Sequence, residues 1–268
     1  MSAALVIGAM KAGTTTLYHD LAYLEGVTRG PKESALFTRG AGHLEPDDST
    51  VTVDVCAEYS MTHMYPDVPD RVVADLGTDI PLLYILRDPL ERVESHLRHL
   101  SSLGQHVMPS QLDEDHHVVL TSRYGYQVDR WLRAGHTRLH LLDFHEYSAA
   151  RSAGIKSLGD LLGVRVGDGF EGQDLSIANS SRDLRSARLG IRAVVRSSAY
   201  AKVKPLIPEG ARRRLKNSRL TEKADADIVL PPAVRDRLTD VFRRDLERVV
   251  SHLDVVPEWA RDYRGLDS

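Results

Sequence analysis

Short, continuous apolar runs alternate with segments of helical periodicity over the N-terminal part of the chain. The apolar runs, which we expect to form strands, are residues 3–9, 51–58, 81–88 and 138–147. The segments with helical spacing are residues 14–24, 67–76, 89–103, 122–135 and 155–164. Because strands that alternate with helices form parallel βαβ units, the pattern predicts an α/β fold with a central parallel sheet flanked by helices.

The pattern changes beyond residue 163, where the chain becomes basic and helical. It ends in an amphipathic segment, residues 231–253, whose expected core stripe is Val234, Leu238, Val241, Leu246 and Val249. We therefore expect one domain over residues 1–268, with a core over about 3–165 and a helical C-terminal extension over about 166–268. Residues 104–121 show neither the helical nor the strand periodicity of apolar residues, which is typical of a long loop that lines or covers a binding site.

Composition and charge argue against several classes of protein. The chain has 268 residues, of which 42% are apolar and 27% are charged, the balance of a globular protein with a buried core. Its formal net charge of -3 argues against a protein that binds nucleic acid in bulk. The single cysteine, Cys56, cannot form an internal disulfide, and we interpret it as a buried apolar residue. No signal peptide and no membrane-spanning run is visible, so we expect a cytoplasmic location.

The first apolar run ends in the loop GAMKAGTTT, residues 8–16, which has the outline of a P-loop. A nucleoside-triphosphate P-loop places its lysine after the second glycine. Here Thr14 follows Gly13, and the lysine is Lys11, inside the loop. Main-chain N–H groups, the N-terminus of the next helix and the threonine hydroxyls are suited to hold an anion. The loop predicts a P-loop-like anion site formed by Lys11, Ala12, Gly13, Thr14, Thr15 and Thr16.

A second group of basic residues follows the third apolar run, in the stretch LRDPLERVESHLRHL. Asp88 is suited to cap the following helix, while Arg87 ends the strand. Arg92 and Ser95 lie one and two turns into the helix. From spacing alone two interpretations stay open: a second anion site, because arginine suits phosphate geometry, or a capped helix with surface arginines. A magnesium-dependent kinase needs a free acidic residue at such a strand end to hold the metal. Here Arg87 stands at the strand end and Asp88 is used as a helix cap, so we expect a site without a metal.

Glu58 ends the second long apolar run and is a candidate general base for an acceptor hydroxyl. A structural carboxylate is an equally good interpretation of its position. The alternative bases are His43 and His63, which lie in stretches that we expect to line the pocket. The 12 histidines of the chain include no complementary set of ligands, so we expect no metal site.

Two of these motifs together resemble the PAPS-dependent sulfotransferases, where PAPS is 3′-phosphoadenosine-5′-phosphosulfate. GAMKAGTTTL resembles the family's 5′-phosphosulfate loop, and LRDPLERVESHLRHL resembles its 3′-phosphate motif, in the same order and at about the same separation. KESALF, AEYSMTHMYP and SRYGYQVDRWL are similar to further segments of the family, the last two to its heparan-sulfate-type branch, which is close to the bacterial-type domain. The likeness covers residues 5–162 and weakens towards Trp259.

The resemblance implies a P-loop-NTPase-like fold and transfer of a sulfuryl group from PAPS to a hydroxyl or amine, leaving 3′-phosphoadenosine-5′-phosphate (PAP). Lys11 would contact the 5′-phosphosulfate and stabilise the leaving oxygen, and residues 13–16 would hold the 5′-phosphate. Arg87 and Ser95 would hold the 3′-phosphate. Glu58 would be the base, and Lys32 would line the acceptor side near the sulfuryl group.

The chain departs from the family's pattern at three places. Tyr59 follows Glu58 where the family usually has lysine. The family's late cofactor-binding loop has only residues 179–188 as a counterpart, where Arg182 and Arg185 are the candidates. The cysteines that often flank that loop in secreted-pathway members are absent.

Two other functions stay open at the level of sequence. A P-loop kinase with a displaced lysine would use ATP and magnesium. A non-catalytic nucleotide-binding protein would keep the PAP site without turnover. For the enzyme we expect a small-molecule, glycolipid or natural-product acceptor and no nucleic-acid partner, because the acidic stretch at residues 113–115 disfavours a highly sulfated polyanion. Neither the acceptor itself nor the oligomeric state follows from the sequence.

Overall fold

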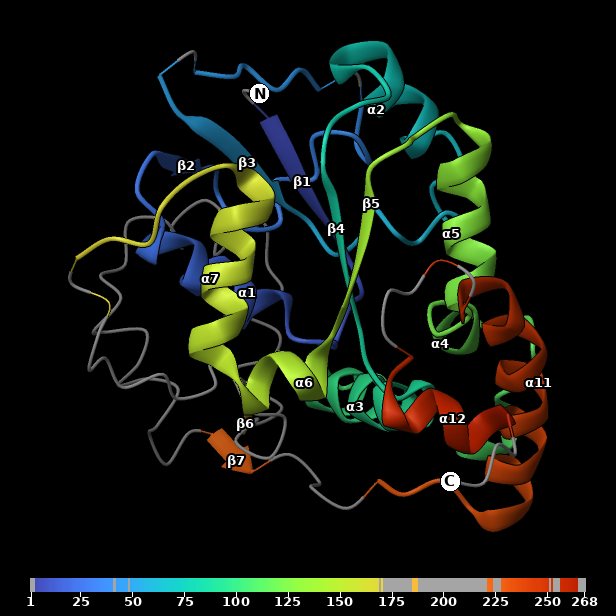
Figure 1. Ribbon diagram of the computed structural model, residues 1–268. Helices are drawn as coiled ribbons and strands as arrows, with labels where there is room; N and C mark the ends of the chain where they lie inside the picture. Colours follow the sequence, from blue (N-terminus) through green and yellow to red (C-terminus); the bar gives the residue numbers. More distant parts are fainter. Residues whose placement is uncertain are drawn as a thin grey trace.

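The computed structural model describes residues 3–40, 42–47, 49–168, 170, 185–187, 221–223, 228–250, 252 and 256–264. Its centre is a five-stranded sheet in the order β2-β3-β1-β4-β5, shown in Figure 1. The strands are β1 (Ala3–Gly8), β2 (Val27–Arg29), β3 (Val51–Val55), β4 (Leu82–Leu86) and β5 (Leu139–Asp143). Every neighbouring pair in this sheet is parallel, which confirms the predicted α/β class.

Helices connect these strands and continue to the C-terminal part of the chain. Those around the sheet are α1 (Thr14–Asp20), α2 (Val68–Leu76), α3 (Pro89–Ser102), α4 (His117–Leu120), α5 (Tyr124–Arg133), α6 (Phe144–Ala149) and α7 (Arg151–Leu162). Two 3-10 turns, η1 (Leu21–Tyr23) and η2 (Pro109–Gln111), lie between them. The C-terminal helices are α11 (Pro232–Val250) and α12 (Glu258–Arg264), and a separate antiparallel pair is formed by β6 (Arg185–Ala187) and β7 (Thr221–Lys223).

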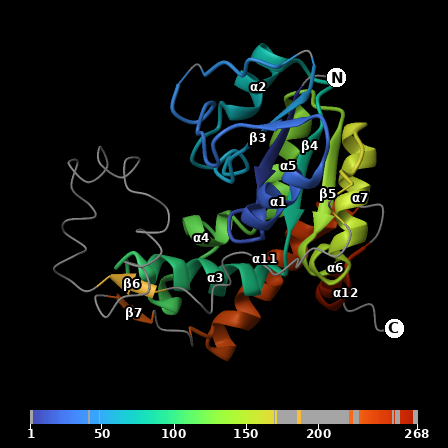
Figure 2. The same cartoon turned by 90° about the vertical axis from the view of Figure 1, so that its left-hand side faces the viewer.

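The three central strands, β1, β3 and β4, are buried on both faces of the sheet, because most of their residues are apolar. Alternate residues of β1 point to opposite sides: Leu5 and Ile7 join one apolar cluster, Ala4 and Val6 the other. The first cluster includes side chains of α2, α3, α5 and α11, and the second includes side chains of α1 and α7. Figures 1 and 2 show the sheet between these two layers.

The structure changes three of the predicted elements. The run at residues 138–147 is a strand only to Asp143, whose side chain accepts a hydrogen bond from the amide of Glu146 at 2.8 Å and so begins helix α6. The predicted loop at residues 104–121 contains η2 and the short helix α4. The edge strand β2 was not predicted, since its three residues carry little apolar signal.

The C-terminal helix α11 packs against α5 and α3 and belongs to the same core. Its predicted stripe, from Val234 to Val249, is buried as expected. From the middle of this helix Asp245 accepts hydrogen bonds from the amides of Gly125 and Tyr126, at 2.7 and 3.0 Å, and so caps α5. A side chain at Gly125 would meet the carbonyl oxygen of Asp245. The boundary between core and extension stays a prediction.

The structure also bears on membrane-spanning helices and on the single cysteine. Among the described residues, no helix is both long and apolar enough to cross a bilayer. Cys56 is fully buried, which confirms its interpretation as an apolar core residue, and burial raises the pKa of its thiol to about 12.

Candidate active site

The carboxyl ends of the parallel strands meet at one edge of the sheet, where α3, α6 and α12 also lie (Figures 1 and 2). The loop after β1, the segment after β3 and the Arg87–Asp88 turn after β4 all begin there. Open α/β sheets bind ligands at this edge. The topology therefore brings the separately predicted motifs to one place.

The loop between β1 and α1, residues 9–13, is tightly wound; because an anion site is predicted here, we call it the phosphate loop. Lys11 has a φ of 68° and Gly13 a φ of 102°, both in the left-handed region. The amide of Ala12 donates to the carbonyl oxygen of Ala9 at 3.1 Å. A Cβ atom at Gly13 would lie 2.5 Å from the ring of Phe144, at the start of α6, so glycine lets the loop approach that ring.

Four basic side chains act on the ammonium group of Lys11. Burial, together with the nearby charges of Lys32, Arg87, Arg92 and Arg98, lowers the pKa of Lys11 to about 8. These cations come from different segments, after β2 and after β4, yet they share one neighbourhood. Such a concentration of positive charge favours an anionic ligand.

The threonines after Gly13 differ in their exposure. Thr14 and Thr16 are buried, while Thr15 is half-buried. The hydroxyl of Thr16 is buried and makes no hydrogen bond within the described part of the chain. A phosphate oxygen would satisfy this group, so the loop fits the anion that the sequence predicts.

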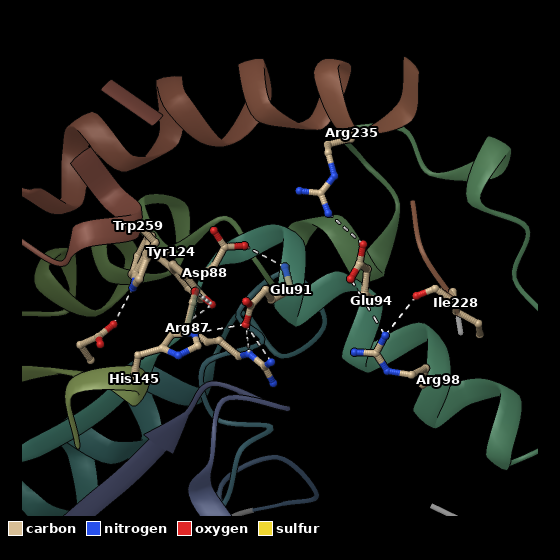
Figure 3. Close-up of polar contacts among 11 residues, drawn as sticks. Arg87, Asp88, Glu91, Glu94, Arg98, Tyr124, His145, Ile228, Arg235 and Trp259 are labelled. Carbon is tan, nitrogen blue, oxygen red and sulfur yellow. Dashed lines mark hydrogen bonds and ion pairs between the residues drawn. The ribbon is translucent and has the colours of Figure 1, made fainter. Parts of the chain in front are cut away.

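Arg87 is held by three neighbours, of which Figure 3 shows Glu91 and Tyr124. Its Nε and Nη2 atoms donate to Oε2 of Glu91 at 3.0 and 2.8 Å. Its guanidinium lies 5.3 Å from the ring centre of Phe144. The hydroxyl of Tyr124 donates to the carbonyl oxygen of Arg87 at 2.8 Å and lies 3.3 Å from its amide nitrogen. Arg87 is thus fixed beside the phosphate loop, and its role at a 3′-phosphate stays a prediction.

Arg92 lies inside the protein. Its side chain is fully buried and donates to the hydroxyl of Ser122 and to the carbonyl oxygens of Met10 and Val118. The interpretation of Arg92 as a surface arginine is therefore wrong, and its part in a second anion site stays a prediction. The predicted cap is confirmed, since Asp88 accepts from the amide of Glu91 at 2.8 Å.

Ser95 lies on α3 beyond Arg92 and is also buried, with 2% of its surface exposed. Its role at a 3′-phosphate stays a prediction. Arg182 lies outside the described residues, so the predicted late cofactor loop is not placed, apart from the short strand β6 that begins at Arg185.

Glu58 lies beside the end of β1, next to the phosphate loop. The amides of Cys56 and Ser60 donate to carbonyl oxygens of β1 at 3.1 and 2.8 Å, so the intervening residues run along that strand. Glu58 is half-buried, and the hydroxyl of Thr38 lies 3.5 Å from its Oε2. Glu58 is therefore partly exposed beside the end of β1, and its role as the base stays a prediction.

Lys32 comes from the loop after β2 and joins the same region. It forms an ion pair with Glu33, whose other carboxylate oxygen accepts from the amide of Ala57 at 3.0 Å. This contact links the Lys32 loop to the Glu58 segment. Three predicted functional residues, Lys11, Lys32 and Glu58, therefore belong to adjoining loops.

Tyr59 takes the place of the family's lysine and points inward. Its hydroxyl donates to Oδ2 of Asp54 at 2.5 Å and lies 3.1 Å from the hydroxyl of Ser34. Asp54 is almost completely buried within β3, and burial raises the pKa of its carboxyl. The residue after Glu58 is therefore a structural link between β3 and the Lys32 loop.

The two histidines considered as bases are far apart in the fold. His43 is exposed and pairs with Asp75, which raises its pKa. Asp75 lines a cavity with Ala3, at the amino end of β1, so the structure does not bring His43 to the site. His63 is half-buried, with Nδ1 3.2 Å from Nε2 of Gln127. Burial lowers the pKa of His63 to about 4.

Two residues around Arg87 were not predicted. Glu91 lies one helical turn beyond Arg87, and an i,i+4 pair of opposite charge on a predicted helix is a signal that could have found it. Phe144 carried no such signal, because the apolar run that contains it indicated a strand.

By sequence, neither a protein-family model nor a curated protein matches the chain. In structure it is similar to a sulfotransferase from Alicyclobacillus acidocaldarius, with a TM-score of 0.58 at 16% identity over 97% of each chain. It is also similar to mouse sulfotransferase SULT7A1 complexed with PAP, with a TM-score of 0.51 at 14% identity over 99% of this chain and 88% of that one. The chain therefore has the α/β fold of the sulfotransferases, as its motifs predict.

Proposed function

We propose that the chain is a PAPS-dependent sulfotransferase, which transfers a sulfuryl group to a hydroxyl or amine of a small-molecule, glycolipid or natural-product acceptor. The observation that carries the proposal is the convergence of Lys11, Lys32 and Arg87, from separate motifs, on one edge of a sulfotransferase fold. A half-buried carboxylate, Glu58, lies in the adjoining segment. The site thus combines charges suited to the donor with a base suited to the acceptor.

Lys11 and Glu58 have complementary roles in the proposed transfer. Glu58 would take the proton of the acceptor hydroxyl as its oxygen bonds to sulfur. Lys11 would stabilise the negative charge that the 5′-phosphate oxygen gains as its bond to sulfur breaks. Lys32 would neutralise the sulfuryl oxygens during this exchange. The chain's own residues supply both the proton acceptor and the positive charge.

The donor would be held at two points. The loop from Ala12 to Thr16 would bind the 5′-phosphate, and the buried hydroxyl of Thr16 supports this assignment. Arg87 would bind the 3′-phosphate, with Ser95 and Arg182 as further contacts. Mouse SULT7A1, which has a similar fold, is complexed with PAP, a nucleotide that carries both phosphates.

The kinase alternative is disfavoured by the carboxylates near the site. Asp88 uses its side chain to cap α3, and Asp54 is hydrogen-bonded to Tyr59 inside the sheet. Neither is free to hold the magnesium of a nucleoside triphosphate. Measuring whether the protein forms a sulfated product from PAPS tests the non-catalytic alternative.

A direct test is to supply PAPS with a panel of phenols, alcohols, amines and glycolipids and to search by mass spectrometry for products that gain one SO₃ group. We expect PAP and a sulfated product, and Lys11→Ala should slow their release by about 10²–10³-fold. PAP binding without any product across the panel would favour the non-catalytic alternative. Phosphorylated product from ATP and magnesium would instead identify a kinase. Cytoplasmic location and acceptor identity stay predictions.

A further inference from the structure

A closed ring of contacts connects Arg87 with the C-terminal helix α12 and returns to Arg87 (Figure 3). Its members come from the ends of β4 and β5 and from the helices α3, α5, α6 and α12. None of the sequence motifs suggests that α12 acts on the nucleotide site. Through the ring, a helix near the C-terminal end of the described residues is connected to Arg87.

The first link is the hydroxyl of Tyr124, which holds the main chain of Arg87 from two sides. It donates to the carbonyl oxygen at 2.8 Å and lies 3.3 Å from the amide nitrogen, within reach to accept its hydrogen. Tyr124 is fully buried, and its ring meets that of Tyr84 edge to face at 5.9 Å. The position of this hydroxyl sets the position of the arginine backbone.

The second link is Trp259 of α12, which packs against Tyr124. The two ring centres are 6.4 Å apart with an interplanar angle of 63°. The indole Nε1 donates to Oδ2 of Asp143 at 2.5 Å, and this bond fixes the orientation of the ring. α12 is itself attached to α11, because Nε of Arg243 donates to the carbonyl oxygen of Tyr263 at 2.8 Å.

The third link runs from Asp143 through α6 to the guanidinium. The other oxygen of Asp143 caps α6, which begins with Phe144 and His145. Phe144 lies under the guanidinium of Arg87, and Nε2 of His145 is 3.1 Å from Oε2 of Glu91. The carboxylate of Asp143 therefore joins Trp259 to the first turn of α6, which carries Phe144 and His145.

Glu91 closes the ring by accepting hydrogen bonds from one edge of the Arg87 guanidinium. Nε and Nη2 of Arg87 both donate to its Oε2. These two bonds leave both N–H groups of Nη1 and the second N–H of Nη2 for other acceptors. A fixed guanidinium loses less conformational entropy when it binds a phosphate than a mobile one would.

We propose that Trp259 and Tyr124 are positioning residues that set the preference of the site for a nucleotide with a 3′-phosphate. This inference rests on the proposed function, because it takes Arg87 as the ligand of that phosphate. The two residues act through Arg87 and do not touch the nucleotide. Their effect should therefore fall on the 3′-phosphate and leave the rest of the nucleotide unaffected.

The test compares PAP with adenosine 5′-monophosphate, which lacks the 3′-phosphate, by titration calorimetry. Wild type, Tyr124→Phe and Trp259→Phe are measured with both ligands. Each variant keeps an aromatic ring and loses one hydrogen-bonding group. We expect PAP affinity to fall about five-fold in each, the effect of roughly one lost hydrogen bond. Affinity for adenosine 5′-monophosphate should change by less than about two-fold.

Tyr126→Phe is the matched control, because Tyr126 lies on the same helix and faces Arg123 at 5.8 Å. It should leave both affinities unchanged. Equal losses for both ligands in the Tyr124 and Trp259 variants would indicate general loosening and overturn the inference, as would unchanged PAP affinity. If wild type itself shows no preference for PAP, the donor assignment fails and the inference fails with it. The wild-type measurement thus separates the two failures.

Discussion

Nη1 of Arg92 lies 3.3 Å from the carbonyl oxygen of Met10, the residue that precedes Lys11 in the phosphate loop. Arg92 is buried in α3, and the two residues are 82 positions apart in the sequence. The same guanidinium donates to the carbonyl oxygen of Val118 and to the hydroxyl of Ser122. One buried charge therefore ties the loop to α3 and to the region of α4.

Arg92→Met should destabilise the protein, because the acceptors of Arg92 lose a buried donor. We expect the free energy of unfolding in urea to fall by on the order of 2–3 kcal/mol. Arg133→Met is the control, since Arg133 is an exposed partner of Asp129 and should cost less than about 0.5 kcal/mol. Similar unfolding curves for both variants would contradict the structural role of Arg92.

The affinity for PAP should fall as the pH rises above about 8. Lys11 has a pKa of about 8, below its ordinary value, so its positive charge is present at lower pH and lost as the pH rises through that value. An anionic ligand binds the charged form more tightly. PAP titrations from neutral to alkaline pH measure the effect. Lys11→Arg, which stays charged, should show a flatter profile, and a flat profile in wild type would argue against Lys11 as a PAP contact.

Glu58→Gln should slow turnover and leave PAP affinity within about two-fold. Loss of a general base typically lowers the rate by about 10²–10⁴-fold, and steady-state rates with a sulfated product as readout would show it. His63→Gln is the comparison, because burial keeps the pKa of His63 near 4 and its imidazole neutral. If the His63 variant loses activity and the Glu58 variant does not, the base is His63.

Tyr59→Phe should weaken the fold and the placement of Lys32. It removes the donor to buried Asp54 and the contact with Ser34, and an unsatisfied buried group costs about 1–3 kcal/mol. Urea unfolding measures the loss. Adding Asp54→Asn should restore part of it, because a neutral amide is less costly to bury than a carboxylate. No gain from the second change would show that the Tyr59–Asp54 bond is not the source.

The sequence predicted correctly those elements that depend only on residues close together in the chain. The apolar runs of β1, β3 and β4 and the cap at Asp88 follow from neighbouring residues alone, and the structure confirms them. The end of β5 could not be predicted in this way, because Phe144 continues the apolar run while Asp143 begins a helix. The direction of Arg92 could not be predicted either, since helical spacing does not say which face another segment will cover.

The surroundings of Arg87 show the same limit more clearly. Glu91 is a neighbour in sequence and was within reach of a spacing argument. Tyr124 contacts Arg87, and Trp259 contacts Tyr124, only because α5 and α12 pack at the sheet edge. Such contacts depend on tertiary structure, so a single sequence identifies the binding motif without the residues that support it.

The cap that Asp245 provides to α5 has a consequence for the order of events during synthesis on the ribosome. The amide of Gly125 donates to Asp245, which is translated 120 residues later. Until α11 emerges, the first turn of α5 has no Asp245 and the apolar surface beside it has no cover. We expect the nascent N-terminal part to remain vulnerable to proteases and chaperone binding until that point, and to become resistant in one late step.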